Sequence, residues 1–118
     1  MLIKIKNLRL KTILGIHPWE ENFDREIIIN AEIETKHLDS QLSDDISDTI
    51  DYDTIVTKIK NLINSKRFKL IEKMAAEIID VVIEDKRIFR CKVEVDKVGV
   101  IEGVDSFSIT LERYGHQN

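Results

Sequence analysis

The sequence of 118 residues is long enough to bury one hydrophobic core and too short for two, so we expect a single domain spanning residues 1–118. Its 22 acidic and 18 basic residues give a formal net charge of −4, which excludes the basic surface typical of nucleic-acid-binding proteins. No apolar run approaches the roughly 20 residues of a membrane span, and lysines interrupt the N-terminus where a signal peptide is apolar, so we expect a soluble, cytoplasmic protein.

Two stretches near the N-terminus alternate in the way that is typical of β-strands. Residues 2–14 place lysines between aliphatic side chains, as in Ile3-Lys4-Ile5-Lys6, which predicts a strand with one face in water. The alternation returns from Glu26 to Thr35, where four apolar residues share one face: Ile27, Ile29, Ala31 and Ile33. Residues 15–24 interrupt the pattern with the only proline, so we expect a hairpin whose strands are joined by a loop.

Two amphipathic helices follow a polar, acidic connection at residues 36–51. Asp51 or Asp53 can cap the first helix, and residues 64–67 end it. Its apolar residues recur at helical spacing: Ile55, Ile59, Leu62 and Ile63. The second helix begins after Phe68 and runs to about Asp85, with a buried stripe of Ile71, Met74, Ala75, Ile78, Ile79 and Val82.

Two further strands complete the chain. Their apolar residues alternate with polar or charged ones at Cys91, Val93, Val95, Phe107, Ile109 and Leu111. The order β-β-α-α-β-β predicts an α+β fold, in which two helices lie on one face of an antiparallel four-stranded sheet. Because the edges of such a sheet can pair with other copies, we expect a homo-oligomer. The only cysteine, Cys91, excludes an intramolecular disulfide and is expected to be a buried thiol.

The sequence lacks the residue patterns that metal binding and nucleophilic catalysis require. The histidines have no metal-ligand spacing, and no second cysteine is present; they are His17, His37 and His116. The four glycines form no phosphate-binding loop, and no serine stands in a nucleophile elbow. We therefore expect a site without a metal.

Acid-base residues stand instead at the ends of the predicted elements: Glu20, Tyr52, Glu72 and Lys97. Glu72 falls in the first turn of a helix, where unpaired backbone N–H groups favour a carboxylate. It can serve as a helix terminus alone, or it can present both oxygens to a flat, nitrogen-rich ligand. The residues by themselves leave both interpretations open.

Five motifs in this order, covering about Ile5 to Arg113, resemble the dihydroneopterin aldolase family, which includes the dihydroneopterin triphosphate 2′-epimerases. The motifs are Gly15-Ile16-x-x-Trp19-Glu20, Asp48-Thr49-Ile50-Asp51-Tyr52, Phe68-x-Leu70-Ile71-Glu72-x-Met74-Ala75, Val93-x-Val95-x-Lys97 and Ile109-x-Leu111-Glu112-Arg113. The resemblance implies the tunnelling fold, in which the sheets of four subunits join into a barrel and two such rings stack into an octamer. It also implies active sites between neighbouring subunits.

The resemblance assigns a role to each candidate residue. Glu72 matches the glutamate that anchors the pterin ring, and Lys97 matches the lysine of acid-base catalysis. Tyr52, from the neighbouring subunit, matches a tyrosine of proton transfer, and Glu20 matches the glutamate that organises the lysine and the side-chain hydroxyls of the substrate. Backbone groups at Ile50 and Ile71 would complete the pterin pocket.

The implied activity is that of a 7,8-dihydroneopterin aldolase of folate biosynthesis. Such an enzyme cleaves its substrate to 6-hydroxymethyl-7,8-dihydropterin and glycolaldehyde without a metal or cofactor, and the same chemistry allows inversion at C2′. One alternative is a dihydroneopterin triphosphate 2′-epimerase, and another is a non-catalytic ring protein that binds pterins or purines through Glu72. Two departures concern the subfamily: no proline follows Lys97, and Arg25 stands where the family has a glutamine.

Overall fold

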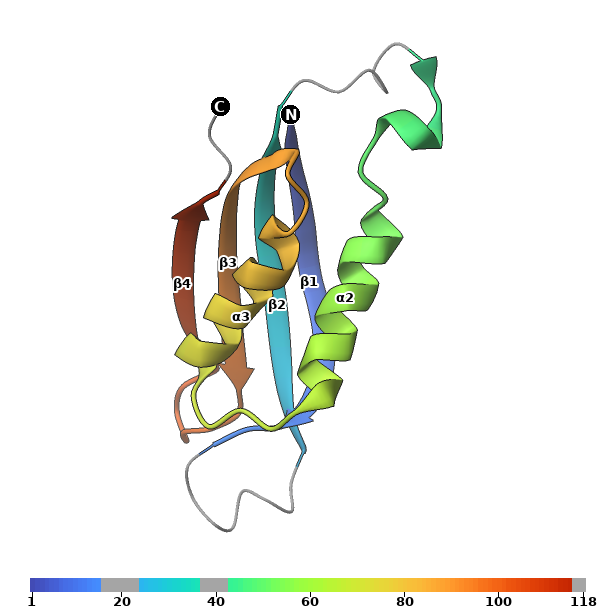
Figure 1. The fold of residues 1–118 in the computed structure, drawn as a ribbon. Helices are drawn as coiled ribbons and strands as arrows, with labels where there is room; N and C mark the ends of the chain where they lie inside the picture. Colours follow the sequence, from blue (N-terminus) through green and yellow to red (C-terminus); the bar gives the residue numbers. More distant parts are fainter. Residues whose placement is uncertain (16–23, 37–42, 116–118) are drawn as a thin grey trace.

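The computed structural model describes residues 1–15, 24–36 and 43–115, and its element order confirms the predicted β-β-α-α-β-β arrangement (Figure 1). The elements are β1 (Leu2–Ile13), β2 (Asp24–Thr35), the short 3₁₀-helix η2 (Ile46–Asp48), α2 (Tyr52–Ser65), α3 (Ile71–Ile83), β3 (Ile88–Val98) and β4 (Ser106–Tyr114). Most of the expected 15–24 loop lies outside the described residues. No helix in the described part of the chain is long and apolar enough to cross a membrane.

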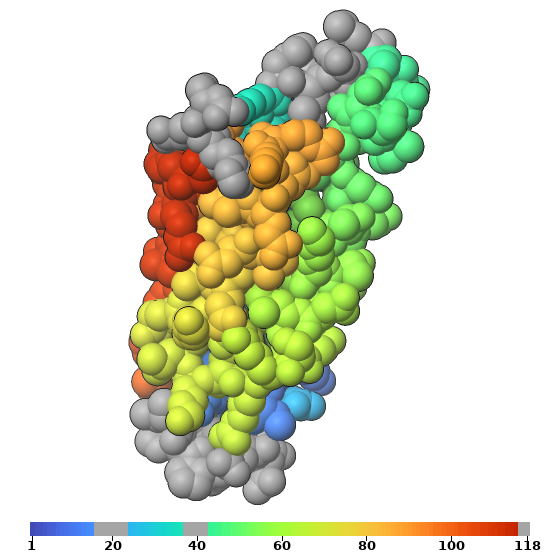
Figure 2. Space-filling model, in the orientation of Figure 1, coloured from blue at the N-terminus to red at the C-terminus, as the bar shows by residue number. Residues whose placement is uncertain are grey.

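The four strands form one antiparallel sheet in the order β1-β2-β3-β4, and both helices lie on the same face of it (Figure 1). In the space-filling view α2 and α3 cover most of the sheet (Figure 2). We call the other side of the sheet the open face. β1 and β4 are its edges.

A bulge in β1 is a feature that the sequence alternation did not predict. The pairing of β1 with β2 shifts between Ile5 and Leu8, and Asn7 adopts a positive φ of 55°. Asparagine tolerates this left-handed conformation better than most residues. The Asn7 N–H donates to the side-chain oxygen of Asn30 at 2.8 Å, which fixes the bulge against β2.

The hydrophobic core lies between the sheet and the helices. The predicted faces of β2, α2 and α3 are buried, with Ile29, Ile59 and Ile78 fully inaccessible to water. Cys91 is also fully buried, and desolvation raises the pKa of its thiol to about 12. The expectation of a buried thiol is therefore confirmed.

The ends of the helices follow from local polar contacts. Asp51 caps α2, because its carboxylate accepts from the Asp53 N–H at 3.0 Å. The α2–α3 connection is held against the end of β1, where the Gly15 N–H donates to the Phe68 carbonyl at 3.3 Å. α3 ends at Ile83, two residues before the predicted Asp85, because the Asp85 side chain accepts from the Arg87 N–H and starts the turn into β3.

Candidate active site

Glu72 and Lys97 lie at the same end of the molecule and on the helix side of the sheet. The last residues of β3 and the first turn of α3 lie at the same end of the molecule, where they are neighbours (Figure 1). Within β3, Val93 and Val95 face the helices, and Lys97 continues this alternation to the same side. Glu72 is exposed in the first turn of α3. The chain thus places an amine and a carboxylate at one rim.

Lys97 stands in a cross-strand row with apolar neighbours. It pairs with Ile27 of β2 and with Phe107 of β4, and it is half-buried. Ile27 is fully buried, whereas the Phe107 side chain is 44% exposed. Lys97 is therefore paired with an accessible aromatic residue, whose ring is a suitable surface for a flat heterocycle.

The start of α3 also offers backbone donors. Leu70 occupies the N-cap position and makes no side-chain capping bond, so first-turn N–H groups have no side-chain acceptor there. Ile71 opens the helix with its side chain directed into the core, at 9% exposure. Its backbone is thereby fixed beside Glu72, as a pocket built from main-chain groups requires.

Tyr52 and Ile50 do not lie at this end of the same chain. Both precede or open α2, whose 14 residues make a helix about 21 Å long, and α2 ends where α3 begins (Figure 1). Tyr52 is 51% exposed, and Ile50 is buried. A single chain therefore places Glu72, Ile71 and Lys97 at one end of the molecule and Tyr52 and Ile50 at the far end of α2. Glu20 lies outside the described residues.

The structure places a further residue, Arg25, near Lys97. Arg25 pairs with Thr12 in the β1–β2 register and shares the helix-side face with Ile27. Because Ile27 is the partner of Lys97, Arg25 is a diagonal neighbour of Lys97 across the β2–β3 pair. Only the strand register reveals this, and a single sequence does not fix the register between distant strands.

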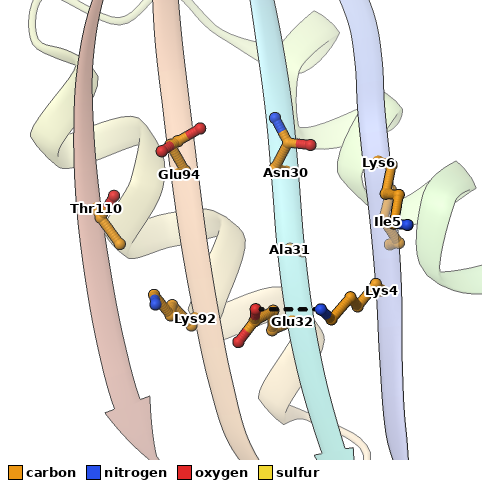
Figure 3. A pocket seen from close by; sticks show the side chains of 9 residues that line it. All are labelled: Lys4, Ile5, Lys6, Asn30, Ala31, Glu32, Lys92, Glu94 and Thr110. Carbon is orange, nitrogen blue, oxygen red and sulfur yellow. Dashed lines mark ion pairs between the residues drawn. The ribbon is translucent and has the colours of Figure 1, made fainter.

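The described residues also form a hollow elsewhere on the molecule. It has a volume of about 600 Å³ and occupies the open face, where Lys4, Glu32 and Lys92 stand on three successive strands (Figure 3). Lys4 and Glu32 form an ion pair there at 3.9 Å. Since Lys92 and Lys97 point to opposite faces of β3, this hollow is separate from the rim that holds Glu72 and Lys97.

Within residues 1–15, 24–36 and 43–115 no three His, Cys, Asp or Glu side chains are grouped so that they could hold a metal ion. The described part of the rim offers a primary amine, a carboxylate, backbone N–H groups and an aromatic edge. These groups can bind a flat ligand that has adjacent N–H donors, and they can transfer a proton at that ligand's side chain.

The element order and the two layers define the class: an α+β domain with the tunnelling fold. The sequence profile described as "FolB: Dihydroneopterin aldolase" matches residues 3–112, and the chain belongs to this family of pterin enzymes.

Three similar proteins illustrate the relationship. The chain is 36% identical over 110 residues to the dihydroneopterin triphosphate 2′-epimerase of Escherichia coli K12, covering 93% of this chain and 92% of the relative. It is 20% identical over 112 residues to the dihydroneopterin aldolase of the same organism, with coverage of 95% and 92%. The crystal structure of E. coli dihydroneopterin aldolase in complex with neopterin superimposes with a TM-score of 0.90 at 20% identity, covering 96% of this chain and 98% of that one.

Proposed function

We propose that this protein is a 2′-epimerase of 7,8-dihydroneopterin triphosphate. The observation that carries the proposal is the 36% identity with a dihydroneopterin triphosphate 2′-epimerase across 110 residues, against 20% with an aldolase. The motifs alone favoured the aldolase and kept the epimerase as the alternative. The difference in identity now favours the alternative.

Cleavage of unphosphorylated 7,8-dihydroneopterin is the second candidate, because both reactions begin by breaking the same bond. The C=N bond of the dihydropterin ring accepts an electron pair, so loss of the 2′-hydroxyl proton breaks the C1′–C2′ bond and leaves an enamine and a two-carbon aldehyde. Re-addition of the aldehyde through its other face inverts C2′. Protonation of C1′ instead completes the cleavage, and the fate of the aldehyde decides between the two activities.

In this mechanism each residue acts on a defined part of the substrate. The Glu72 carboxylate accepts hydrogen bonds from the amino group and the ring N–H of the pterin, and the backbone at Ile71 adds a polar contact. The Lys97 amine exchanges the proton of the 2′-hydroxyl, a contribution of roughly a hundredfold to ten-thousandfold. The substrate supplies its own electron sink.

The remaining residues come from a second copy in this proposal. Tyr52 and Ile50 reach the rim of a neighbouring subunit in a homo-oligomer of four or eight chains, and Glu20 orders Lys97. The support is geometric, since one chain holds Tyr52 and Lys97 near opposite ends of α2.

The test is a parallel assay of the purified protein on 7,8-dihydroneopterin and on its triphosphate, with products separated by chromatography. We expect inversion of the triphosphate at C2′. Cleavage confined to the unphosphorylated compound would make the protein an aldolase. Binding of both pterins without turnover of either would support the non-catalytic ring protein instead.

A further inference from the structure

The short segment that leads into α2 carries two residues that the proposed site takes from a neighbouring chain. Tyr52 opens α2 and is 51% exposed, and Ile50 lies two residues earlier with its side chain buried at 1% exposure. Burial of an apolar side chain fixes its place but has no directional preference. The direction of the peptide groups in this segment therefore depends on the hydrogen bonds that they make.

Arg87 supplies one of these hydrogen bonds from the turn between α3 and β3. Its Nη1 group donates to the Thr49 carbonyl at 3.0 Å, although the two residues are 38 positions apart in the sequence. The carbonyl of Thr49 and the N–H of Ile50 belong to the same planar peptide group. A donor to this carbonyl therefore also fixes the direction of the Ile50 N–H, a backbone group expected in the pterin pocket.

The Arg87 side chain is itself held in place by Asp85. The guanidinium donates to both carboxylate oxygens, from Nε to Oδ1 at 3.0 Å and from Nη2 to Oδ2 at 2.7 Å. The side-chain hydrogen bond from Arg87 holds the pKa of the Asp85 carboxyl below its ordinary value, so the pair stays charged at neutral pH. Because the guanidinium is planar and is fixed along one edge, its Nη1 group points in a defined direction.

The contact between Arg87 and Thr49 crosses a hollow of about 280 Å³. Residues of the segment and of α2 line one side of it, and Val82, Asp85 and Arg87 line the other. The start of α2 and the α3–β3 turn lie at the same end of the molecule (Figure 1). Because this space separates the segment from the turn, the segment has room to shift when the Arg87 contact is lost.

A second contact joins the same two parts of the chain farther along α2. Lys58 pairs with Glu84 at 3.6 Å, and the two side chains are 46% and 63% exposed. An exposed ion pair of this kind contributes little to stability. Lys58 lies more than one helical turn after Tyr52, so its loss affects α2 without touching the Thr49 carbonyl. It provides a matched control for Arg87.

We propose that Arg87 is a positioning residue for the part of the active site that each chain presents to its neighbour. The inference rests on the proposed function and deepens it, since it names the group that orients the Ile50 backbone and Tyr52. Arg87 acts through the Thr49 carbonyl and does not contact the substrate. A shift of the segment moves the Tyr52 hydroxyl away from the proton that it transfers, and a misplacement of about 1 Å can cost a hundredfold in rate.

The first experiment compares Arg87→Gln and Lys58→Gln with the wild-type protein, on whichever pterin the wild type converts. We expect Arg87→Gln to lower kcat by roughly tenfold to a hundredfold, because the glutamine side chain is too short to reach the Thr49 carbonyl. Lys58→Gln should keep kcat within about twofold. Circular dichroism and size-exclusion chromatography establish that each variant folds and assembles. Equal kcat values in assembled Arg87→Gln and the wild type would overturn the proposal.

A mixing experiment distinguishes positioning from a general loss of stability. When Arg87→Gln is co-expressed with Lys97→Ala, a site that takes Lys97 from the first variant and Tyr52 from the second is intact. About a quarter of the sites in a randomly mixed ring meet this condition. Co-expression with Tyr52→Phe should give no such recovery, because both variants then damage the same half of the site. Equal recovery in the two mixtures, or none with Lys97→Ala, contradicts the positioning role.

Arg87→Lys is a second variant for both experiments. Lysine keeps the charge and one donor but lacks the planar fork, so its kcat should lie between those of Arg87→Gln and the wild type. It takes the place of Arg87→Gln if that variant does not assemble. A kcat of Arg87→Lys equal to that of the wild type, with no assembled Arg87→Gln, would show that the directed contact to Thr49 is not needed.

A binding measurement separates the positioning role from the proposed function when the wild-type protein turns over neither pterin. The Kd of neopterin is then measured by fluorescence titration. We expect Arg87→Gln to raise this Kd by about threefold to tenfold, because the Ile50 N–H loses its direction, and Lys58→Gln to leave it unchanged. That result supports the positioning role although the proposed function has failed. Equal Kd values in all three proteins, or no binding by the wild type, overturn the positioning role as well.

Discussion

Lys97 and Glu72 stand at one rim, and their removal should have different consequences. Lys97→Ala should lower kcat by roughly a hundredfold to ten-thousandfold, because the proton of the 2′-hydroxyl loses its acceptor, while the Kd of a pterin changes less than about threefold. Glu72→Ala should weaken pterin binding by roughly tenfold or more, because the ring donors lose a charged acceptor. Steady-state kinetics and fluorescence titration with neopterin measure the two quantities.

Lys92→Ala is the control for this pair of variants. Lys92 lies in the same strand as Lys97 and points to the open face, so its loss removes a similar charge without touching the rim. Full turnover by Lys97→Ala, at a kcat equal to that of Lys92→Ala, would contradict the acid-base role. Unchanged pterin binding by Glu72→Ala would show that Glu72 is only a good helix terminus.

Burial alone should determine the reactivity of the Cys91 thiol. Its side chain is fully buried, and desolvation raises the pKa of the thiol to about 12 from an ordinary 9.0. Since the thiolate is the nucleophile, the native protein should fail to react with a disulfide reagent at pH 8 over the time in which urea-unfolded protein reacts fully. Absorbance of the released thiol measures both rates. Rapid labelling of the native protein would show that β3 opens readily.

The raised pKa of Cys91 also determines how the stability of the fold changes with pH. Because the folded state holds the Cys91 proton more tightly than the unfolded chain, this group contributes stability below the unfolded pKa of about 9. That contribution is lost as the pH rises from 9 toward 12. A Cys91→Ser variant lacks a thiol that titrates in this window, so its stability should fall less steeply over the same interval.

At the scale of the strands, Arg90 joins three carboxylates of the open face into one cluster. Its guanidinium lies 2.6 Å from Glu34, 3.3 Å from Glu32 and 3.5 Å from Glu112, so it links β2, β3 and β4. The Arg90 side chain is 10% exposed, whereas the carboxylates are about a third exposed. The cluster is therefore stronger than a surface ion pair and weaker than a fully buried one.

Arg90→Ala should lower the free energy of unfolding by about 1–3 kcal/mol, because three carboxylates are left facing one another. Arg9→Ala, which removes an exposed pair with Glu26, should cost at most about 1 kcal/mol. Urea unfolding at pH 7 compares the free energies of unfolding of the two variants. Equal losses in the two variants would show that Arg90 acts as an ordinary surface charge.

The helices and strands could be predicted from the sequence because each of them buries one face. The alternation of β2 and the helical spacing in α3 identified both elements and their buried residues before the fold was known. The bulge at Asn7 was not accessible, since it depends on a partner, Asn30, in another strand. The same limit hid the place of Arg25, because its proximity to Lys97 is a property of the register and not of either strand alone.

At the scale of the whole molecule, the candidate site divides into two parts. The resemblance supplied the roles of Glu72, Lys97 and Tyr52, and only the fold indicates where each lies. Alternation places Lys97 on the helix side of β3, and the antiparallel course of α2 and α3 carries Tyr52 away from Glu72 (Figure 1). The helix predicted between Asp51 and residues 64–67 already implies that separation, whereas the position of Lys97 near the start of α3 depends on how the helices pack on the sheet.

This separation leads to a prediction about mixed oligomers. Tyr52→Phe and Lys97→Ala should each be nearly inactive as homo-oligomers. Co-expression of the two should restore activity, because a subunit that keeps Lys97 can then meet a neighbour that keeps Tyr52. In a ring with random incorporation, each site draws its two halves from adjacent subunits, so about a quarter of the sites should be intact. Activity per milligram of the doubly tagged, co-purified oligomer is the measurement.

The control for subunit mixing is a pair of variants within one half of the site. Glu72→Ala and Lys97→Ala affect residues that one chain brings to the same rim, so their mixture should form no intact site. Recovery in the Tyr52 mixture and none in this control would show that the active site is shared between chains. If the Tyr52 mixture stays as inactive as the control although size-exclusion chromatography shows mixed rings, Tyr52 does not act across the interface. The two ends of α2 would then belong to separate functions, and proton transfer at the rim would rest on residues of one chain.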